Sequence, residues 1–260
     1  MFDSGVGGLT VLHECLVSLP HEDFVYLGDT ARFPYGVREA AELRSFALEL
    51  AELLLDEGAK LLVVACNAAT AAALPALRER FGNVVGVVTP ESQLAARATR
   101  NGHVGLLATP ATVASGAYER ALKVAAPDAV LHAVACPELA PLIQAGEEID
   151  QRLVDCVEGY CSPLRAAGVD TVILGCTHYP LVRPIIQRAL GRGVEIVSSG
   201  QAIADAVHAA LDGRENEPDR RGDYRFLCTG DPDEFSRIGT RFLQMPLGQV
   251  EHVERRRAVA

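Results

Sequence analysis

The sequence is short of lysine, since Lys60 and Lys123 are the only two, and it has no tryptophan. An enzyme that uses pyridoxal phosphate needs a lysine to form a Schiff base with that cofactor. Lys60 precedes an apolar run and Lys123 lies late in an expected helix. Neither is therefore at the carboxyl end of a strand, where ligands bind in parallel α/β sheets. We expect no pyridoxal phosphate.

Long apolar runs and a basic surface are also missing. No stretch of about 18 consecutive apolar residues occurs, which argues against a membrane-spanning helix. The N-terminus lacks the basic and apolar regions of a secretory signal. Acidic residues outnumber basic residues by 34 to 24, so a nucleic-acid surface is not expected. We expect a cytoplasmic protein that binds neither membranes nor nucleic acid.

Patterns for metals, disulfides and nucleotides are absent as well. Seven cysteines are present without the short paired spacing of a zinc ribbon or a disulfide framework. The HExxH pattern of zinc enzymes is missing, and the glycines of "SGVGG" at 4–8 match neither the dinucleotide nor the P-loop spacing. We expect free thiols, no metal site and no cofactor.

What is present is an alternation of apolar runs and helical patterns. Continuous apolar runs predict strands that are covered on both faces, as in parallel sheets. After a first strand that ends at Asp3, these runs lie at 24–29, 60–66, 84–88, 103–109, 130–136, 170–176, 194–199 and 224–230. Helices are predicted at 38–58, 69–80, 91–99, 111–124, 138–145, 148–167, 180–190, 200–212 and 232–242. The fold class is α/β with mostly parallel sheets.

Two segments repeat one plan. "LLVVACNAAT" at 61–70 and "TVILGCTHYP" at 171–180 each give an apolar strand, a cysteine, polar residues and then a helix. We interpret the echo as two α/β lobes whose strand ends face each other. The first lobe is predicted to hold residues 1–89 with 200–260, and the second to hold residues 90–199.

Polar side chains gather at the predicted strand ends. Hydroxyls, amides and backbone N–H groups at helix starts suit an anionic ligand. The candidates are Asp3, Ser4, Pro34, Tyr35, Gly36, Cys66, Asn67, Thr112, Cys176, Thr177 and His178.

Cys66 and Cys176 are the sharpest of these features, because each ends a strand and precedes a helix. Two thiols that reach opposite faces of one carbon can act as a pair of proton-transfer groups. A following helix N-terminus is expected to lower a thiol pKa. Asp3 is the expected proton partner of Cys66, and His178 that of Cys176. Inert packing of both thiols, or a zinc site of Cys66, Cys176 and His178, are the alternatives.

The motifs "FDSGVGGLTVL", "GDTARFPYG", "ACNAAT", "TPATVASGAYERAL", "ACPELAPLI" and "LGCTHYPLVRPII" occur in this order from residue 2 onward. Together they resemble the cofactor-independent glutamate racemases, and the likeness extends to about residue 245. The resemblance implies two lobes related by a pseudo-twofold axis, with the site between them. It also implies interconversion of L- and D-glutamate for peptidoglycan synthesis, and a homodimer.

Carried onto this sequence, the resemblance makes Cys66 and Cys176 the two catalytic groups, with Asp3 and His178 assisting them. It further implies a set of positions that hold the substrate's carboxylates and amine. These positions are Ser4, Pro34, Tyr35, Gly36, Asn67, Thr112 and Thr177.

Some positions depart from the family pattern. Ala68 lacks a usual hydroxyl, Thr89 replaces a usual acid, and Gln144 replaces a usual glutamate. These changes keep open a racemase or thiol isomerase that acts on aspartate or another acidic compound. Asp3, as the third residue, is expected to fray. This keeps open a third alternative, a catalytically weak ligand-binding relative.

Overall fold

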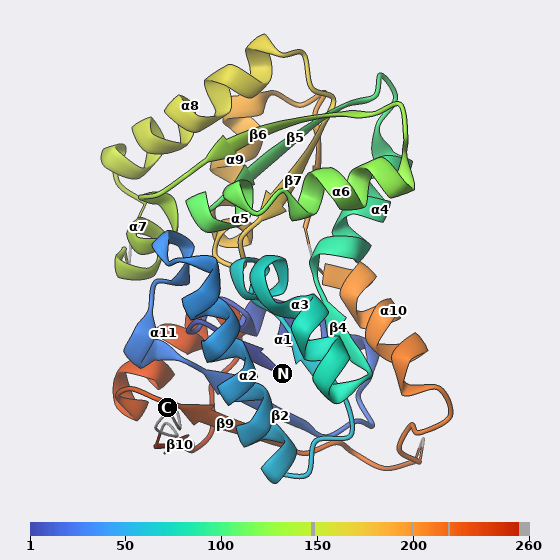
Figure 1. Cartoon of the computed structure of the whole chain (residues 1–260). Coiled ribbons are helices and arrows are strands. Elements are labelled where there is room, and N and C mark those ends of the chain that lie inside the picture. The colour runs from blue at the N-terminus through green and yellow to red at the C-terminus, as the bar shows by residue number, and fades with distance from the viewer. Residues whose placement is uncertain (147–148, 199, 218, 255–260) are drawn as a thin grey trace.

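The computed structural model describes residues 1–146, 149–198, 200–217 and 219–254. Within these residues the strands form two sheets, of six and four strands, and every neighbouring pair is parallel. The two sheets occupy separate lobes, stacked one above the other in Figure 1. The predicted α/β class with two lobes is therefore confirmed.

The first sheet has the order β10-β9-β2-β1-β3-β4 and the second has the order β6-β5-β7-β8. The strands of the first are β1 (Phe2–Asp3), β2 (Phe24–Gly28), β3 (Leu62–Val64), β4 (Val84–Gly86), β9 (Tyr224–Cys228) and β10 (Val250–His252). Those of the second are β5 (His103–Ala108), β6 (Val130–Ala135), β7 (Thr171–Gly175) and β8 (Glu195–Val197).

Helices cover both sheets, which explains why central strands such as β3 and β7 are buried and apolar on both faces. The α-helices are α1 (Leu9–Ser18), α2 (Ala40–Asp56), α3 (Asn67–Phe81), α4 (Val88–Ala98), α5 (Pro110–Ala114), α6 (Ala117–Ala125), α7 (Leu139–Ala145), α8 (Gln151–Ala166), α9 (Arg183–Leu190), α10 (Gly200–Leu211) and α11 (Pro232–Leu243). Short 3₁₀ turns lie at Thr30–Arg32, Tyr35–Val37 and Tyr179–Val182. None of these described helices is long and apolar enough to cross a membrane.

The two sheets share one strand order. Four neighbouring strands of the first sheet lie in the order β2-β1-β3-β4, and the four strands of the second sheet lie in the order β6-β5-β7-β8. In both, the strand that comes first in the chain lies between the second and the third, and the fourth lies beside the third. The similar segments at 61–70 and 171–180 thus occupy equivalent places in two lobes that share a strand order. Cys66 comes after β3 and Cys176 comes after β7, which are equivalent strands. The exact division at residues 89 and 199 stays a prediction.

Some predicted elements differ from the observed ones. The helix predicted over 111–124 is two helices, α5 and α6, because Gly116 takes a left-handed conformation with φ of 64° between them. Helix α1 and strand β10 were not predicted. Strand β10 is a short edge strand with the largely polar sequence "VEH", so it has no apolar run to reveal it. Residues 148 and 199, at the ends of two predicted elements, lie outside the described residues.

The lobes touch where the loop after β1 meets the loop after β7. Thr10 Oγ1 donates to the carbonyl of Thr177 across this boundary, at 3.2 Å. Gly7 packs so tightly that a Cβ there would lie 2.3 Å from Thr177 Oγ1 and 2.5 Å from His178 Nδ1. The absence of a side chain at Gly7 therefore permits the close approach of the two lobes.

We expect Gly7→Ala to lower the midpoint of thermal unfolding, since overpacking of this kind costs about 1 to 3 kcal/mol. Gly159→Ala is the matched control, because a Cβ on this glycine of α8 meets nothing within 4 Å. That control should keep or raise the midpoint, since alanine favours a helix over glycine by about 1 kcal/mol. Equal midpoints for wild type and Gly7→Ala would contradict the packing described above.

Candidate active site

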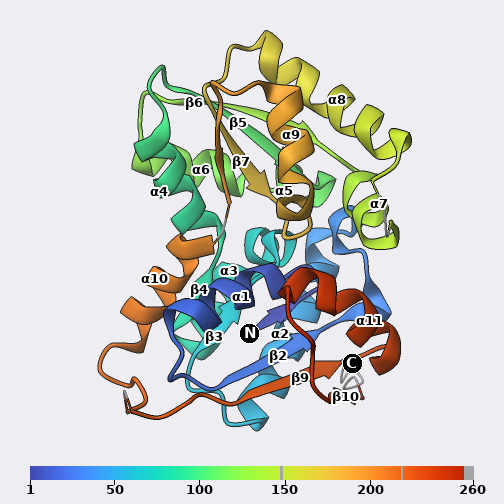
Figure 2. The same cartoon turned by 180° about the vertical axis from the view of Figure 1, so that it is seen from behind.

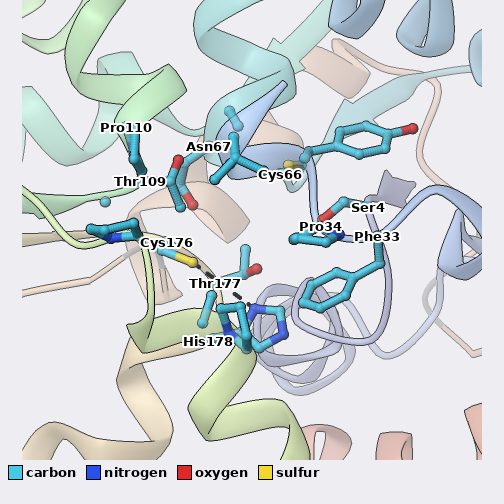
Figure 3. A pocket seen from close by; sticks show the side chains of 18 residues that line it. Ser4, Phe33, Pro34, Cys66, Asn67, Thr109, Pro110, Cys176, Thr177 and His178 are labelled. Atoms are coloured by element: carbon cyan, nitrogen blue, oxygen red, sulfur yellow. Dashed lines mark hydrogen bonds between the residues drawn. The ribbon is translucent and has the colours of Figure 1, made fainter. Parts of the chain in front are cut away.

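One cavity lies between the lobes at the carboxyl ends of the strands, and most of the predicted site residues line it (Figure 3). These are Ser4, Pro34, Tyr35, Gly36, Cys66, Asn67, Cys176, Thr177 and His178. Phe33, Val37, Ala68, Thr109, Pro110, Pro137, Ala140, Pro141 and Gly175 complete the lining. Figure 3 shows Cys66 and Cys176 reaching this cavity from different elements, with His178 beside Cys176.

Asp3 and Thr112 are not in the cavity wall but lie directly behind it. Thr177 Oγ1 donates to Asp3 Oδ2 at 3.3 Å, and the backbone N–H of Gly5 donates to Asp3 Oδ1 at 2.9 Å. Thr112 Oγ1 lies 3.0 Å from Oγ1 of Thr109, which does line the cavity. Asp3 therefore contacts a residue of the cavity wall, Thr177, and Thr112 contacts another, Thr109.

The expectation that Asp3 frays is wrong. Its strand, β1, pairs with β2 on one side and β3 on the other, and the Asp3 side chain is fully buried at 0% exposure. Burial raises the pKa of the Asp3 carboxyl from 3.8 to about 6, although hydrogen bonds from Gly5, Gly8 and Thr177 oppose the rise. Asp3 can therefore carry a proton close to neutral pH.

His178 lies between Cys176 and Gln144. Its Nδ1 is 3.9 Å from Cys176 Sγ, and its Nε2 is 2.9 Å from Oε1 of Gln144. Burial, with a smaller effect from the charge of Arg241, lowers the pKa of His178 from 6.5 to about 3. The ring is thus neutral at pH 7. Because Gln144 Oε1 can only accept, the ring proton sits on Nε2 and the Nδ1 lone pair faces the thiol.

The ring of His178 is also held by aromatic neighbours. Phe33 lies 5.5 Å from it between ring centroids, and Phe242 meets it edge-on at 5.0 Å. Arg241 anchors α7, which carries Gln144, by donating to the carbonyls of Ile143 and Gly146. None of these contacts has a sequence signal, because they join residues far apart in the chain.

The thiols behave differently from the sequence expectation. Cys66 caps α3 and accepts a hydrogen bond from the N–H of Ala69 at 3.5 Å, which favours a thiolate as expected. Burial outweighs this contact and, with the nearby Asp3 carboxylate, raises the Cys66 pKa to about 12. Burial likewise raises the pKa of Cys176 well above its usual value, and charge on Cys66 raises it further. Both groups are therefore thiols at pH 7.

Tyr35 was expected to hold the substrate, but its hydroxyl has another partner. Its hydroxyl donates to Asp29, whose carboxylate also binds Arg32 Nε at 2.5 Å and the Thr229 hydroxyl at 2.6 Å. The hydroxyl is thus used inside the first lobe. Tyr35 and Gly36 line the cavity at the start of a 3₁₀ turn that begins after Pro34.

The zinc alternative finds no support in the geometry. Among the described residues, no group of three or more His, Cys, Asp or Glu side chains is arranged to hold a metal ion. Cys66, Cys176 and His178 are described residues, so they do not form such a group.

Comparison with known proteins identifies the family. Residues 11–207 match the family model described as Asp/Glu/Hydantoin racemase. The chain belongs to this racemase family. A relative named glutamate racemase, from Beutenbergia cavernae, is 46% identical, with 94% of this chain and 88% of the relative covered.

Solved racemase structures agree over nearly the whole chain. Glutamate racemase isoform RacE1 from Bacillus anthracis matches with a TM-score of 0.93 at 38% identity, covering 97% of this chain and 96% of that one. Glutamate racemase from Francisella tularensis, solved in complex with D-glutamate, matches with a TM-score of 0.90 at 30% identity, covering 97% and 95%.

Gln144→Glu should raise the pKa of His178, since a carboxylate next to Nε2 favours the charged ring. The pKa is read from the imidazole signals of labelled protein in an NMR titration. Gln151→Glu on the exposed start of α8 is the control and should leave the His178 signals unchanged. An unshifted His178 in Gln144→Glu would show that residue 144 does not face the ring.

Proposed function

We propose that the protein interconverts L- and D-glutamate by passing protons between substrate and two thiols, without a cofactor. The observation that carries the proposal is that Cys66 and Cys176, from equivalent strands of the two lobes, line one cavity. The relatives named above, one of them solved with D-glutamate, support glutamate as this substrate.

In one direction the proposed reaction starts at Cys176. The Nδ1 lone pair of His178 accepts the Cys176 thiol proton, and the thiolate then removes the proton from the α-carbon of the substrate. Cys66 donates its thiol proton to the opposite face of that carbon. Asp3, whose raised pKa allows it to carry a proton, re-protonates Cys66. The reverse direction runs through the same groups, with the Asp3 carboxylate as the first acceptor.

The high thiol pKa values are consistent with this scheme. A thiol held in a dry site is a stronger base once it has lost its proton. The loss itself is costly, so each thiol needs a proton partner. Two buried groups are proposed for this role: Asp3, whose charge acts on Cys66, and His178, whose Nδ1 is 3.9 Å from Cys176 Sγ.

The remaining cavity residues are proposed to hold the substrate's carboxylates and amine. Ser4 and Thr177 offer hydroxyls, Asn67 begins α3, and Pro34, Tyr35 and Gly36 line the same cavity. Thr112 supports the wall through Thr109. Helix N-termini favour anions, and both α3 and α5 start at this cavity.

A different acidic substrate, such as aspartate, is the second candidate. The observation behind it is that Ala68 lines the cavity with no hydroxyl to offer, while Thr70 turns away and donates to the carbonyl of Val64. Circular dichroism with a panel of acidic amino acids separates the two. The third alternative, a catalytically weak ligand-binding relative, was raised because Asp3 was expected to fray. That reason no longer applies, because Asp3 is buried and accepts a hydrogen bond from the N–H of Gly5.

From the family resemblance, we further propose that the D-glutamate serves peptidoglycan synthesis in the cytoplasm and that the chain forms a homodimer. Residues 1–89 with 200–260, and residues 90–199, are proposed as the two lobes on either side of the reacting carbon.

Cys66→Ser and Cys176→Ser should each abolish racemisation, with a loss of at least a factor of about 100. The rate of racemisation is measured as deuterium incorporation at the α-carbon of L-glutamate in heavy water. Cys156→Ser, on the partly exposed face of α8, is the control and should retain full activity. Wild-type turnover in both single variants would refute the two-thiol mechanism.

A further inference from the structure

A buried carboxylate, Glu91, lies behind the cavity wall and has no part in the mechanism above. It belongs to α4 and is 0% exposed. The hydroxyl of Tyr118, on α6, donates to it. Asn67, the first residue of α3, donates from Nδ2 to Tyr118 Oη at 2.7 Å and to Glu91 Oε2 at 3.2 Å. The cluster therefore joins the second lobe to a cavity residue of the first.

This cluster determines which way the Asn67 amide points. Tyr118 has one hydroxyl proton and gives it to Glu91, so both groups that face Asn67 are acceptors. A flipped amide would place Oδ1 against a carboxylate and leave Nδ2 without either acceptor. Only one orientation satisfies the cluster, and it directs Nδ2 toward Glu91 and Tyr118.

The oxygen of the Asn67 amide, Oδ1, takes no part in the cluster. Asn67 Oδ1 is buried and accepts no hydrogen bond from any residue that the structure describes. Asn67 also lines the cavity. A buried acceptor without a partner costs free energy, so a donor that arrives with a ligand is favoured at this atom. The carboxylate on the far side of the amide polarises it and makes a positively charged donor the better match.

We propose that Glu91 and Tyr118 are positioning residues that fix the Asn67 amide so that Oδ1 accepts a hydrogen bond from the α-ammonium group of the substrate. The inference rests on the proposed function and deepens it. The site would select amino acids over dicarboxylates of similar shape that lack the ammonium group.

Binding of two ligands tests this selection. Calorimetry is performed with racemic glutamate, so that turnover does not change the ligand, and with glutarate, which has no group on the carbon that carries the ammonium. Glu91→Gln keeps the shape but adds a side-chain donor, which allows the Asn67 amide to flip. We expect its affinity for glutamate to fall about tenfold, in line with the loss of one charged hydrogen bond, while its affinity for glutarate stays within about twofold.

Tyr118→Phe should shift selectivity in the same direction but less, because Glu91 still accepts from Nδ2. Turnover of each variant should show KM for glutamate rising more than kcat falls. Glu158→Gln and Tyr160→Phe on α8 make the same chemical changes away from the cluster and should match wild type.

If Glu91→Gln lowered the affinity for glutamate and for glutarate by the same factor, the cluster would only support the fold. If the affinity for glutamate were unchanged, the cluster would have no role in binding. Either result would overturn the proposal. Glutamate binding by wild type without α-proton exchange would instead count against the proposed racemisation, since the ligand preference is measured without turnover.

Discussion

The burial of two thiols in one cavity is the constraint on which the rest of the site depends. A thiolate is strongly disfavoured in such a place, and the pKa of Cys66 rises to about 12. Each thiol therefore needs its own proton partner, and each partner must be buried next to it. Asp3 and His178 are the partners proposed above. Burial raises the carboxyl pKa of Asp3, which suits it to carry a proton, but lowers the imidazole pKa of His178, so the transfer from Cys176 to His178 is the more costly of the two.

The site is complete only when the lobes are together. Gly7 lets the first lobe approach Thr177 and His178 of the second. Arg241, on α11, holds the end of α7, which places Gln144 against His178; Figure 2 shows these two helices at the boundary between the lobes. Lobe closure therefore also fixes the proton position on His178.

Much of this arrangement could be predicted from the sequence, because parallel strands with apolar faces bring the residues at their carboxyl ends to one edge of the sheet. The positions of Cys66 and Cys176 at two strand ends could be predicted in this way. The sign of the thiol pKa shifts could not, since it depends on how much burial outweighs one backbone N–H. The use of the Tyr35 hydroxyl by Asp29 and the contact of Gln144 with His178 depend on tertiary packing that no local pattern encodes.

The most direct test of the account is a crystal structure of the protein with D-glutamate bound. The account predicts that the α-carbon lies between Sγ of Cys66 and Sγ of Cys176, on opposite faces and within roughly 3 to 4 Å of each. A substrate with both sulfurs on one face, or with either sulfur out of reach of the α-carbon, would contradict it.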